Sequence, residues 1–284
     1  MTGDDEVLRA LEGSIDRPSA ARVYDYFLGG TNHYAIDREF AEMVLAKLPK
    51  FGDSARTCRQ FLGRAVRYCA LAGIRQFVDI GSGLPTQGNV HEVADAARPE
   101  EDTRVVYIDN EPIALAHSKV LLADTADPHR HRAIAGDLLQ APDLWQRVLE
   151  TGVIDEREPV GLVINAVLHF IGDDQEPGKA LEFYRDRLAP GSMLVLSHVT
   201  MQNPVDSAER EGMEEVAAYY ERTTNPGRGR TSEEFARFFG DWVLEEPGLV
   251  YAPAWHPDAG TISSGHPERT RILAGVARKP GPST

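Results

Sequence analysis

Residues Phe77-Val78-Asp79-Ile80-Gly81-Ser82-Gly83 carry the strongest structural signal in this chain of 284 residues. A short apolar run rich in branched side chains, typical of a buried strand, ends there in two glycines. Glycine adopts positive φ and lets the backbone approach a ligand closely, and a helix after such a turn presents unpaired N–H groups. The stretch therefore predicts a nucleotide-binding turn at the end of a strand, with a turn that holds no ligand as the alternative.

The residues around this turn separate one cofactor class from another. A dinucleotide fingerprint has a third glycine where this chain has Thr86, and it does not place an acid such as Asp79 two residues before the first glycine. Both differences argue against a nicotinamide or flavin cofactor. The Asp-x-Gly-x-Gly form instead resembles the first motif of the Rossmann-like methyltransferases, which bind S-adenosylmethionine. That resemblance implies that Asp79, Gly81, Ser82 and Gly83 hold the carboxylate and amino end of the cofactor.

Length and composition are those of a globular protein with a sizeable core. Hydrophobic residues make up 42% of the sequence, and 284 residues suffice for one large α/β domain or two small ones. Three of the first six residues are acidic, where a secretory signal would be basic, and no stretch is apolar enough to span a membrane, so we expect a cytoplasmic protein. Cys58 and Cys69 stand eleven residues apart on one predicted helix. That places them about 16 Å apart along its axis, too far for a disulfide.

The net charge of −14 lies outside the N-terminal segment. Residues 1–70 hold ten basic and ten acidic side chains, which leaves twenty against thirty-four for the remainder. An acidic body repels phosphate backbones, so a nucleic-acid substrate is disfavoured and a small-molecule acceptor is expected. Arg222, Arg228 and Arg230 are the only hint of a basic patch, and a solvated loop explains them more simply. No Cys/His cluster has zinc spacing, so no metal site is predicted.

The second predicted strand, residues 104–108, is followed directly by an acid. A carboxylate at a strand tip accepts two hydrogen bonds from a ribose diol, so Asp109 and the adjacent Asn110 are predicted cofactor ligands. The separation of Asp109 from Gly83 is 26 residues, somewhat longer than usual. The alternative is that Asp109 is an acid at a helix N-terminus, where the macrodipole favours it.

A third strand over residues 131–136 again ends in an acid, Asp137, with Leu138 next. In methyltransferases an acid at this place commonly meets the adenine amino group, so the resemblance implies that Asp137 and Leu138 contact the base. The alternative is a cap for a predicted helix over residues 138–149.

The fourth predicted strand, residues 160–164, leads into Asn165 and His169. Ligands of open α/β sheets bind outside the carboxyl ends of the strands, so both side chains are placed near the transferred methyl group or its acceptor. His169 has the chemistry of a general base near neutral pH. A packed histidine in an apolar turn is the alternative.

The remaining pattern completes a seven-stranded, mostly parallel sheet with helices on both faces and one reversed edge strand. The fifth strand is predicted over residues 193–197 and the last two over residues 249–251 and 271–276. A helix over residues 206–222 and a capping box at residues 231–234 predict a helical cap. We expect one domain over residues 1–284. Its parts are an N-terminal helical extension (1–70), a cofactor-binding core (71–200), a cap insertion (201–240) and the last two strands (241–284).

The N-terminal extension contains the second distinctive region of the sequence. Residues 17–34 are dense in aromatics, glycines and polar groups, and residues 56–71 have the spacing of a helix packed on the sheet. With Asp37-Arg38-Glu39 after it, the segment resembles the opening of an actinobacterial family of S-adenosylmethionine-dependent methyltransferases. The later motifs occur in that family's order: Asp109-Asn110-Glu111-Pro112, Gly136-Asp137, residues 165–170, Glu246-Pro247-Gly248 and Trp255. The resemblance implies a Rossmann-like class I fold and that cofactor. The acceptors of the family are largely uncharacterised.

The aromatic residues of this extension have two interpretations. In the first, Tyr24, Phe27 and Tyr34, together with Tyr26, close over the cofactor with their ring faces toward the sulfonium. Gly29 and Gly30 would then allow a close approach, and Asn32 would lie at the same site. In the second, the segment is a helix packed on the core that ends in a glycine C-cap.

These observations predict a methyltransferase that acts by in-line displacement and releases S-adenosyl-L-homocysteine. Positioning in a closed pocket supplies much of the catalysis, so a base such as His169 is required only for a protonated acceptor. A protein that senses S-adenosyl-L-methionine or its product without turnover is the alternative, and an NAD-dependent reductase is the third option.

Overall fold

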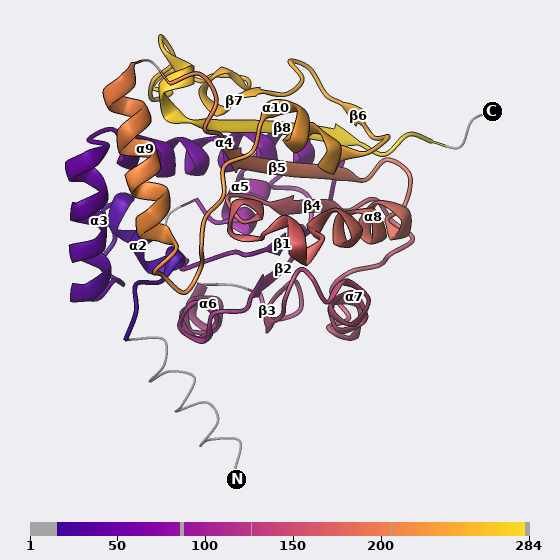
Figure 1. Cartoon of the computed structure of the whole chain (residues 1–284). Helices are drawn as coiled ribbons and strands as arrows, with labels where there is room; N and C mark the ends of the chain where they lie inside the picture. The colour runs from indigo at the N-terminus through magenta and orange to yellow at the C-terminus, as the bar shows by residue number, and fades with distance from the viewer. Residues whose placement is uncertain (1–15, 86–87, 126, 205, 282–284) are drawn as a thin grey trace.

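The computed structural model describes residues 16–281 except 86–87, 126 and 205, and Figure 1 shows an α/β fold built around one mixed sheet. The strands are β1 Gln76–Ile80, β2 Arg104–Asp109, β3 His131–Ala135, β4 Gly161–Ile164, β5 Met193–Val199, β6 Val243–Leu244, β7 Val250–Tyr251 and β8 Ile272–Arg278. The α-helices are α2 Ala20–Phe27, α3 Ala35–Lys47, α4 Phe51–Leu71, α5 Val90–Ala97, α6 Pro112–Thr125, α7 Ala141–Glu150, α8 Pro177–Arg187, α9 Ser207–Tyr220 and α10 Ser232–Ala236.

The sheet has the predicted mostly parallel topology. The strand order is β3-β2-β1-β4-β5-β8-β6, and β7 also pairs with β8. The first five strands are mutually parallel, and β8 runs antiparallel to β5. The α/β class and the reversed strand are therefore confirmed, and the carboxyl ends of β1 to β5 lie along one edge of the sheet.

The sheet has eight strands instead of the predicted seven, because its last edge is interrupted. Val243 and Leu244 pair with Arg278 and Ala277, whereas β7 pairs three residues further along β8, with Ala274 and Leu273. Residues 245–249 connect the two short strands. Of the two short strands, only β7 was predicted, within residues 249–251, and β6 was missed.

The starts of three helices differ from the predicted ones. The helix expected from residue 87 begins at Val90, with Asn89 and Glu92 as its capping box, and Thr86 and Gln87 lie outside the described residues. The helix expected from residue 138 begins at Ala141. The helix expected from residue 56 begins earlier, at Phe51.

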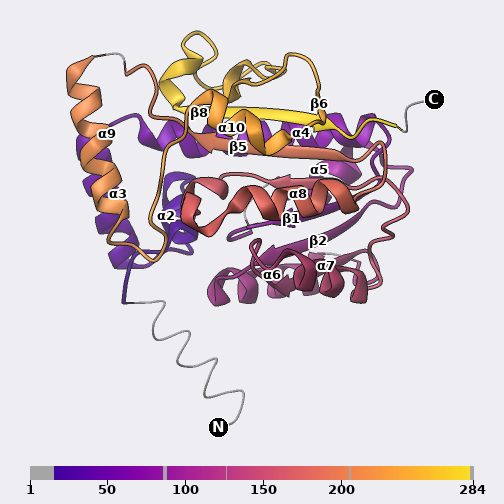
Figure 2. The same cartoon turned by 45° about the vertical axis from the view of Figure 1, so that its right-hand side comes forward.

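Both faces of the parallel strands are covered, which explains their continuous apolar sequences. One face packs on α7, α8 and α10 around Trp145, Tyr184 and Phe235. The other packs on α4 and α5 around Phe61 and Trp255. Figure 2 shows α8 and α10 in front of the sheet with α4 and α5 behind it.

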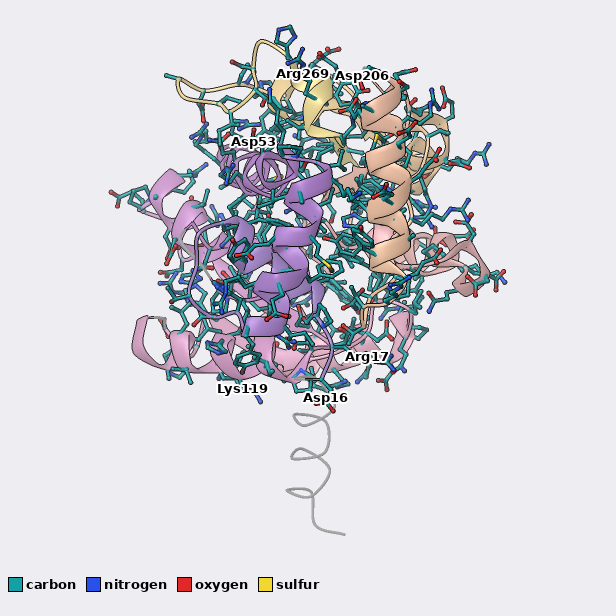
Figure 3. The ribbon with its side chains drawn as sticks, turned by 60° about the vertical axis from the view of Figure 1, so that its left-hand side comes forward. Asp16, Arg17, Asp53, Lys119, Asp206 and Arg269 are labelled. Carbon is teal, nitrogen blue, oxygen red and sulfur yellow. The ribbon has the colours of Figure 1, made fainter. Side chains whose placement is uncertain are left out.

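The predicted cap divides between two places. Figure 3 shows α9 alongside α3, and Gly212 permits this close crossing because a Cβ there would lie 2.9 Å from the carbonyl oxygen of Lys47. Val216 of α9 joins a separate core with α2 and α3. By contrast, Phe235 and Phe239 of the 231–240 segment pack in the main core on the sheet, so α10 does not belong to the cap.

Cys58 and Cys69 are both buried in α4 and unpaired, as their spacing predicted. Within the described part of the chain, no helix combines the length and the apolar character that crossing a membrane requires.

A buried ion pair attaches the N-terminal helices to the sheet. Arg22 Nε donates to Asp37 Oδ2 at 2.6 Å, and both side chains are fully buried. The same guanidinium donates to Glu111 Oε1 at 2.9 Å, at the start of α6. Asp37 also accepts from the backbone N–H groups of Ser19 and Tyr34. One arginine thereby connects α2, α3 and the strand-end turn after β2.

Replacing Arg22 by Ala is expected to lower the free energy of unfolding by about 3–5 kcal/mol, because Asp37 would remain buried without its cation. Urea denaturation measures this loss. Arg38→Ala removes an exposed arginine from the same helix region and is the matched control, expected within about 0.5 kcal/mol of the parent. Equal losses in the two variants would contradict a structural role for the buried pair.

Candidate functional site

A cavity of about 480 Å³ lies at the carboxyl ends of the parallel strands and is enclosed by the N-terminal helices and α9. This volume falls within the usual range for small-molecule sites. Most of the predicted site residues line it: Tyr24, Phe27, Asp79, Gly81, Ser82, Gly83, Asp109, Asn110, Asp137, Leu138, Asn165 and His169. Residues far apart in the sequence therefore meet at one place.

The glycine turn after β1 has the conformation that only glycine adopts readily. Gly81 has φ +74° and Gly83 has φ +66°. A Cβ on Gly81 would lie 2.3 Å from a methyl carbon of Val167, whereas a Cβ on Gly83 would meet nothing within 4 Å. The first glycine is therefore required by packing as well as by φ, and the second leaves open space beside the cavity.

Asp109 holds this turn against the end of β2. Its Oδ2 accepts from the Gly83 N–H at 2.7 Å, and its Oδ1 accepts from the Glu111 N–H at 2.9 Å. Burial raises the pKa of Asp109, although these backbone donors oppose the shift. The helix-terminal interpretation thus describes part of its role. A carboxylate has about four lone-pair sites, so two more donors can still bind.

Asp79 and Arg59 bring opposite charges to the same end of the cavity. Burial raises the pKa of Asp79 to about 7, against the lowering influence of Arg59, and the carboxylate of Asp109 adds to the increase. The side chain of Arg59 on α4 donates to Asn89 Oδ1 at 3.3 Å. Arg59 was not predicted as a site residue, and nothing in the sequence separates it from the three other arginines of α4.

Asp137 lies at the cavity, but it does not cap α7. Its Oδ1 accepts from the Leu139 N–H at 2.9 Å, within the turn that precedes the helix. Gly136 before it is required by packing, because a Cβ there would lie 2.4 Å from Leu144. Leu138 is 3% exposed and serves both the cavity wall and the core.

The turn after β4 is strained and firmly held. Ala166 has φ +59°, which is rare for a residue with a side chain. Ser197 of β5 holds this turn, because its hydroxyl accepts from the Ala166 N–H at 2.9 Å and donates to Asn165 Oδ1 at 2.8 Å. With its oxygen so used, Asn165 is left with amide N–H groups to offer the cavity.

His169 follows in the short 3-10 helix η1 (Leu168–Phe170). Its Nδ1 is buried without a hydrogen-bond partner. Burial first, then His198 and Arg230, lowers the pKa of His169 well below its usual value. The imidazole is therefore neutral at physiological pH, which leaves it able to accept a proton but makes it a weak base.

Arg230 anchors the loop that carries His169. Its guanidinium donates to the carbonyl oxygens of Leu168 and Ile171, at 2.7 and 2.8 Å, and pairs with Asp173 at 2.7 Å. It also donates to Nε2 of His198 at 2.8 Å, which fixes that imidazole as neutral. The solvated-loop interpretation is therefore wrong for Arg230, which is 3% exposed.

The N-terminal signature divides between the cavity and a structural turn. Tyr24 and Phe27 line the cavity, and the Tyr24 hydroxyl donates to the Ala55 carbonyl at 3.0 Å. Five other predicted residues are not among the lining residues: Tyr26, Gly29, Gly30, Asn32 and Tyr34.

The buried carboxylate of Asp25 explains why these residues turn away from the cavity. Its Oδ2 accepts from the Asn32 N–H at 2.8 Å, and a Cβ on Gly30 would lie 2.0 Å from its Oδ1. Gly29, at φ +79°, follows the C-terminus of α2 as a glycine cap. Tyr34 is 42% exposed and its ring lies under Arg22. For this part of the signature, the packed helix with a glycine cap is the interpretation that fits.

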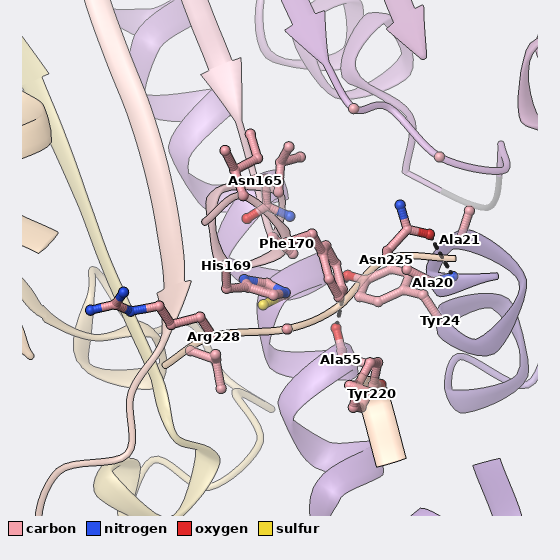
Figure 4. Close-up of a pocket in the computed structure, with 18 of the residues that line it drawn as sticks. Ala20, Ala21, Tyr24, Ala55, Asn165, His169, Phe170, Tyr220, Asn225 and Arg228 are labelled. Atoms are coloured by element: carbon pink, nitrogen blue, oxygen red, sulfur yellow. Dashed lines mark hydrogen bonds between the residues drawn. The ribbon is translucent and has the colours of Figure 1, made fainter. Parts of the chain in front are cut away.

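The half of the cavity away from the glycine turn is apolar and aromatic. Its lining includes Phe51, Phe170, Met213, Val216 and Tyr220, and Figure 4 shows Phe170 next to His169. The loop after α9 closes the cavity against the start of α2. There Thr224 N–H donates to the Pro18 carbonyl, and Ala20 N–H to Asn225 Oδ1.

One family model and two solved structures match this chain over almost its whole length. The model of the S-adenosyl methyltransferase family matches residues 9–280. A candidate methyltransferase from Thermobifida fusca YX is 35% identical, with a TM-score of 0.83, and the match covers 93% of this chain and 96% of that one. A DUF574 family protein from Streptomyces avermitilis MA-4680 is 34% identical, with a TM-score of 0.84 and coverage of 93% and 98%.

A more distant likeness concerns the fold alone. PigF, solved with S-adenosylhomocysteine, has 13% identity and a TM-score of 0.50, and the match covers 86% of this chain and 68% of that one. Among the curated proteins, no sequence matches.

Gly81→Ala is expected to destabilise the fold by roughly 2–4 kcal/mol, from positive φ and from the clash with Val167. Gly88→Ala is the matched control, since Gly88 has φ +72° and a Cβ there would meet nothing within 4 Å. The Gly88→Ala variant should lose only the part of the free energy of unfolding that comes from positive φ, about 1–2 kcal/mol. Unfolding in urea compares the two, and adding Val167→Ala to Gly81→Ala should recover part of the difference. Equal losses at both glycines would contradict the packing requirement.

Asp79→Asn is expected to stabilise the protein at pH 8 by roughly 2–4 kcal/mol more than at pH 4. Burial raises the pKa of Asp79 in the folded protein to about 7. The protonated side chain therefore contributes to the free energy of unfolding in full below pH 4, and this contribution is lost as the pH rises to about 7. The amide does not ionise and avoids that loss. Denaturation at pH 4, 6 and 8 checks this, with the exposed Asp102→Asn as control. A pH-independent difference would refute it.

Proposed function

The chain belongs to the family of S-adenosyl methyltransferases, and we propose that it transfers the methyl group of S-adenosylmethionine to a small-molecule acceptor. The cofactor of the family is S-adenosylmethionine. One observation supports this cavity as the site of the reaction. The glycine turn, two buried acids and an arginine meet at one end of it, and the other end is apolar.

The cofactor end of the cavity suits a zwitterion attached to a nucleoside. We assign the cofactor carboxylate to Arg59 and the Gly83 turn, and its ammonium group to Asp79. Ser82 supports this assignment, since its hydroxyl oxygen is buried without a partner and lines the cavity. A bound carboxylate would supply the acceptor that this hydroxyl lacks.

The nucleoside is assigned to the next two strand ends. The remaining lone pairs of Asp109 suit the ribose diol, with Asn110 beside it. Asp137 and Leu138 are assigned to adenine, because they lie at the tip of β3, next to β2 in the sheet. The order of the strands thus matches the order of methionine, ribose and base along the cofactor.

The chain's own residues would act mainly by positioning. When bound, S-adenosylmethionine supplies an electrophilic methyl group on a positively charged sulfur. Tyr24 and Phe27 place aromatic rings at the cavity, which suits that cation. Aligned approach in an enclosed site supplies roughly 7–11 kcal/mol of the barrier reduction. Asn165, held by Ser197, and neutral His169 stand at the acceptor side.

Two wider proposals concern the source of the protein and its location in the cell. We propose an actinobacterial source. The two similar proteins, at 35% and 34% identity to this chain, come from the actinobacteria Thermobifida fusca and Streptomyces avermitilis. The cytoplasmic location agrees with two cysteines left as buried thiols.

Thermal-shift assays with S-adenosylmethionine, S-adenosylhomocysteine and NAD test the cofactor. Only the first two are expected to raise Tm. Asp109→Ala should weaken cofactor binding by about 2–4 kcal/mol in calorimetry, because it removes two charge-assisted hydrogen bonds. Glu100→Ala removes an exposed acid as control. Stabilisation by NAD alone would overturn the cofactor assignment, and unchanged affinity in Asp109→Ala would leave that residue a purely structural role.

Turnover is tested separately with methyl-labelled cofactor and a metabolite extract. Transfer of label into a small molecule is expected. Proven binding with repeated failure to transfer label would favour the sensor, which binds the same ligand without chemistry.

A further inference from the structure

The apolar half of the cavity is lined by aromatic rings from three separate elements. Phe51 comes from α4, Phe170 from η1 and Tyr220 from the end of α9. The ring centroids of Phe170 and Tyr220 are 6.1 Å apart, and those of Phe51 and Tyr220 are 6.3 Å apart. Such rings attract flat aromatic ligands through offset and edge-to-face contacts, beyond what their buried area alone contributes.

This half of the cavity offers no unpaired charge among its described residues. Arg228 and Arg271 are its charged side chains, and both are engaged. Arg228 pairs with Asp173 at 2.6 Å, and its guanidinium points away from Phe170 in Figure 4. Arg271 pairs with Glu209 and donates to the carbonyl oxygens of Gln202 and Asn203. A charged acceptor would lose its hydration there without gaining a partner, so the site favours a neutral one.

His169 stands where this aromatic half meets the strand ends. Its ring centroid is 4.2 Å from that of Phe170. The backbone of η1 is held by the hydrogen bond from Arg230 to the carbonyl oxygen of Leu168. A neutral imidazole at this point serves an acceptor that must lose a proton, such as a hydroxyl group. An aromatic amine has a free lone pair and needs no base before attack.

We propose that the acceptor is an uncharged, planar aromatic compound that presents a hydroxyl group to His169. This inference rests on the proposed function and specifies its substrate class. The hydroxyl oxygen forms the new bond to the methyl carbon. The carbon–sulfur bond breaks with its electron pair retained by sulfur, which becomes neutral. The hydroxyl proton passes to the imidazole of His169 and then to solvent, so the products are a methyl ether, S-adenosylhomocysteine and a proton.

Three probe compounds of similar size separate shape from charge. They are 2-naphthol, which is planar and neutral, 6-hydroxy-2-naphthoate, which adds a carboxylate, and decahydro-2-naphthol, which is neutral but not planar. Calorimetry first establishes that wild-type protein binds S-adenosylmethionine. Each probe is then titrated into protein saturated with S-adenosylhomocysteine, and turnover with S-adenosylmethionine is followed by mass spectrometry of the methyl ether.

Binding and methylation of 2-naphthol at least tenfold better than the other two probes are expected. Failure of cofactor binding would count against the proposed function itself. With cofactor bound, preference for the carboxylate or the saturated alcohol, or no binding of 2-naphthol, would overturn the proposed acceptor class.

Variants locate the acceptor relative to the cofactor. Phe170→Leu should raise KM for 2-naphthol at least tenfold while the Kd of S-adenosylmethionine changes less than twofold. Phe40→Leu removes another ring in contact with Tyr220 that does not line the cavity, and it is the control for lost packing. Its KM should stay within twofold of the parent. An equal loss of cofactor affinity in Phe170→Leu would instead assign that ring to the sulfonium and overturn the acceptor site.

His169→Gln tests whether the hydroxyl proton passes to this imidazole. It should reduce kcat for 2-naphthol at least tenfold, with KM changed less than threefold, and the loss should shrink as the pH approaches the pKa of the naphthol. A kcat unchanged by the substitution would show that the hydroxyl proton does not pass to His169.

Discussion

A methyl group of Val167 packs against the Cα of Gly81, and this contact sets the spacing of the two turns that form the site. Positive φ at Gly81 bends the chain away from β1, so the N–H groups of Gly81 and Ser82 both reach the carbonyl oxygen of Ile108. The Gly83 N–H then reaches Asp109. Because no side chain intervenes, the turn after β4 can close on the turn after β1. The cofactor end and the acceptor end consequently share one cavity.

The two ends of this cavity differ in electrostatic character because different parts of the chain build them. Strand-end carboxyl groups and Arg59 supply polar and charged groups at the cofactor end, where a zwitterion and a diol need partners. The N-terminal helices and α9 supply rings and aliphatic groups at the other end. Arg22 makes this division possible, since its buried pairs with Asp37 and Glu111 attach the helical wall to the turn after β2.

The loop that carries His169 is held from outside the cavity. Arg230 donates hydrogen bonds to the backbone carbonyl oxygens of Leu168 and Ile171, and its contact with Nε2 of His198 requires that imidazole to be neutral. Its charge also opposes protonation of His169. A residue that is not among those lining the cavity thus fixes the place of a candidate base and adds to the effect of burial, which keeps that base neutral. The turn with positive φ at Ala166 is likewise held from outside, by the hydroxyl of Ser197 on β5.

The sequence by itself determined the alternating architecture, the glycine turn and the acids at the ends of β2 and β3. Those features follow from backbone requirements and periodicity within about ten residues, which local pattern records. Only the tertiary structure placed Arg59 at the cavity, buried Arg230, split the last edge strand and turned Tyr34 outward. Each of these depends on contacts between segments far apart in the chain. The fate of an arginine or a tyrosine depends on which partner is present when the segments meet, and local pattern does not record that partner.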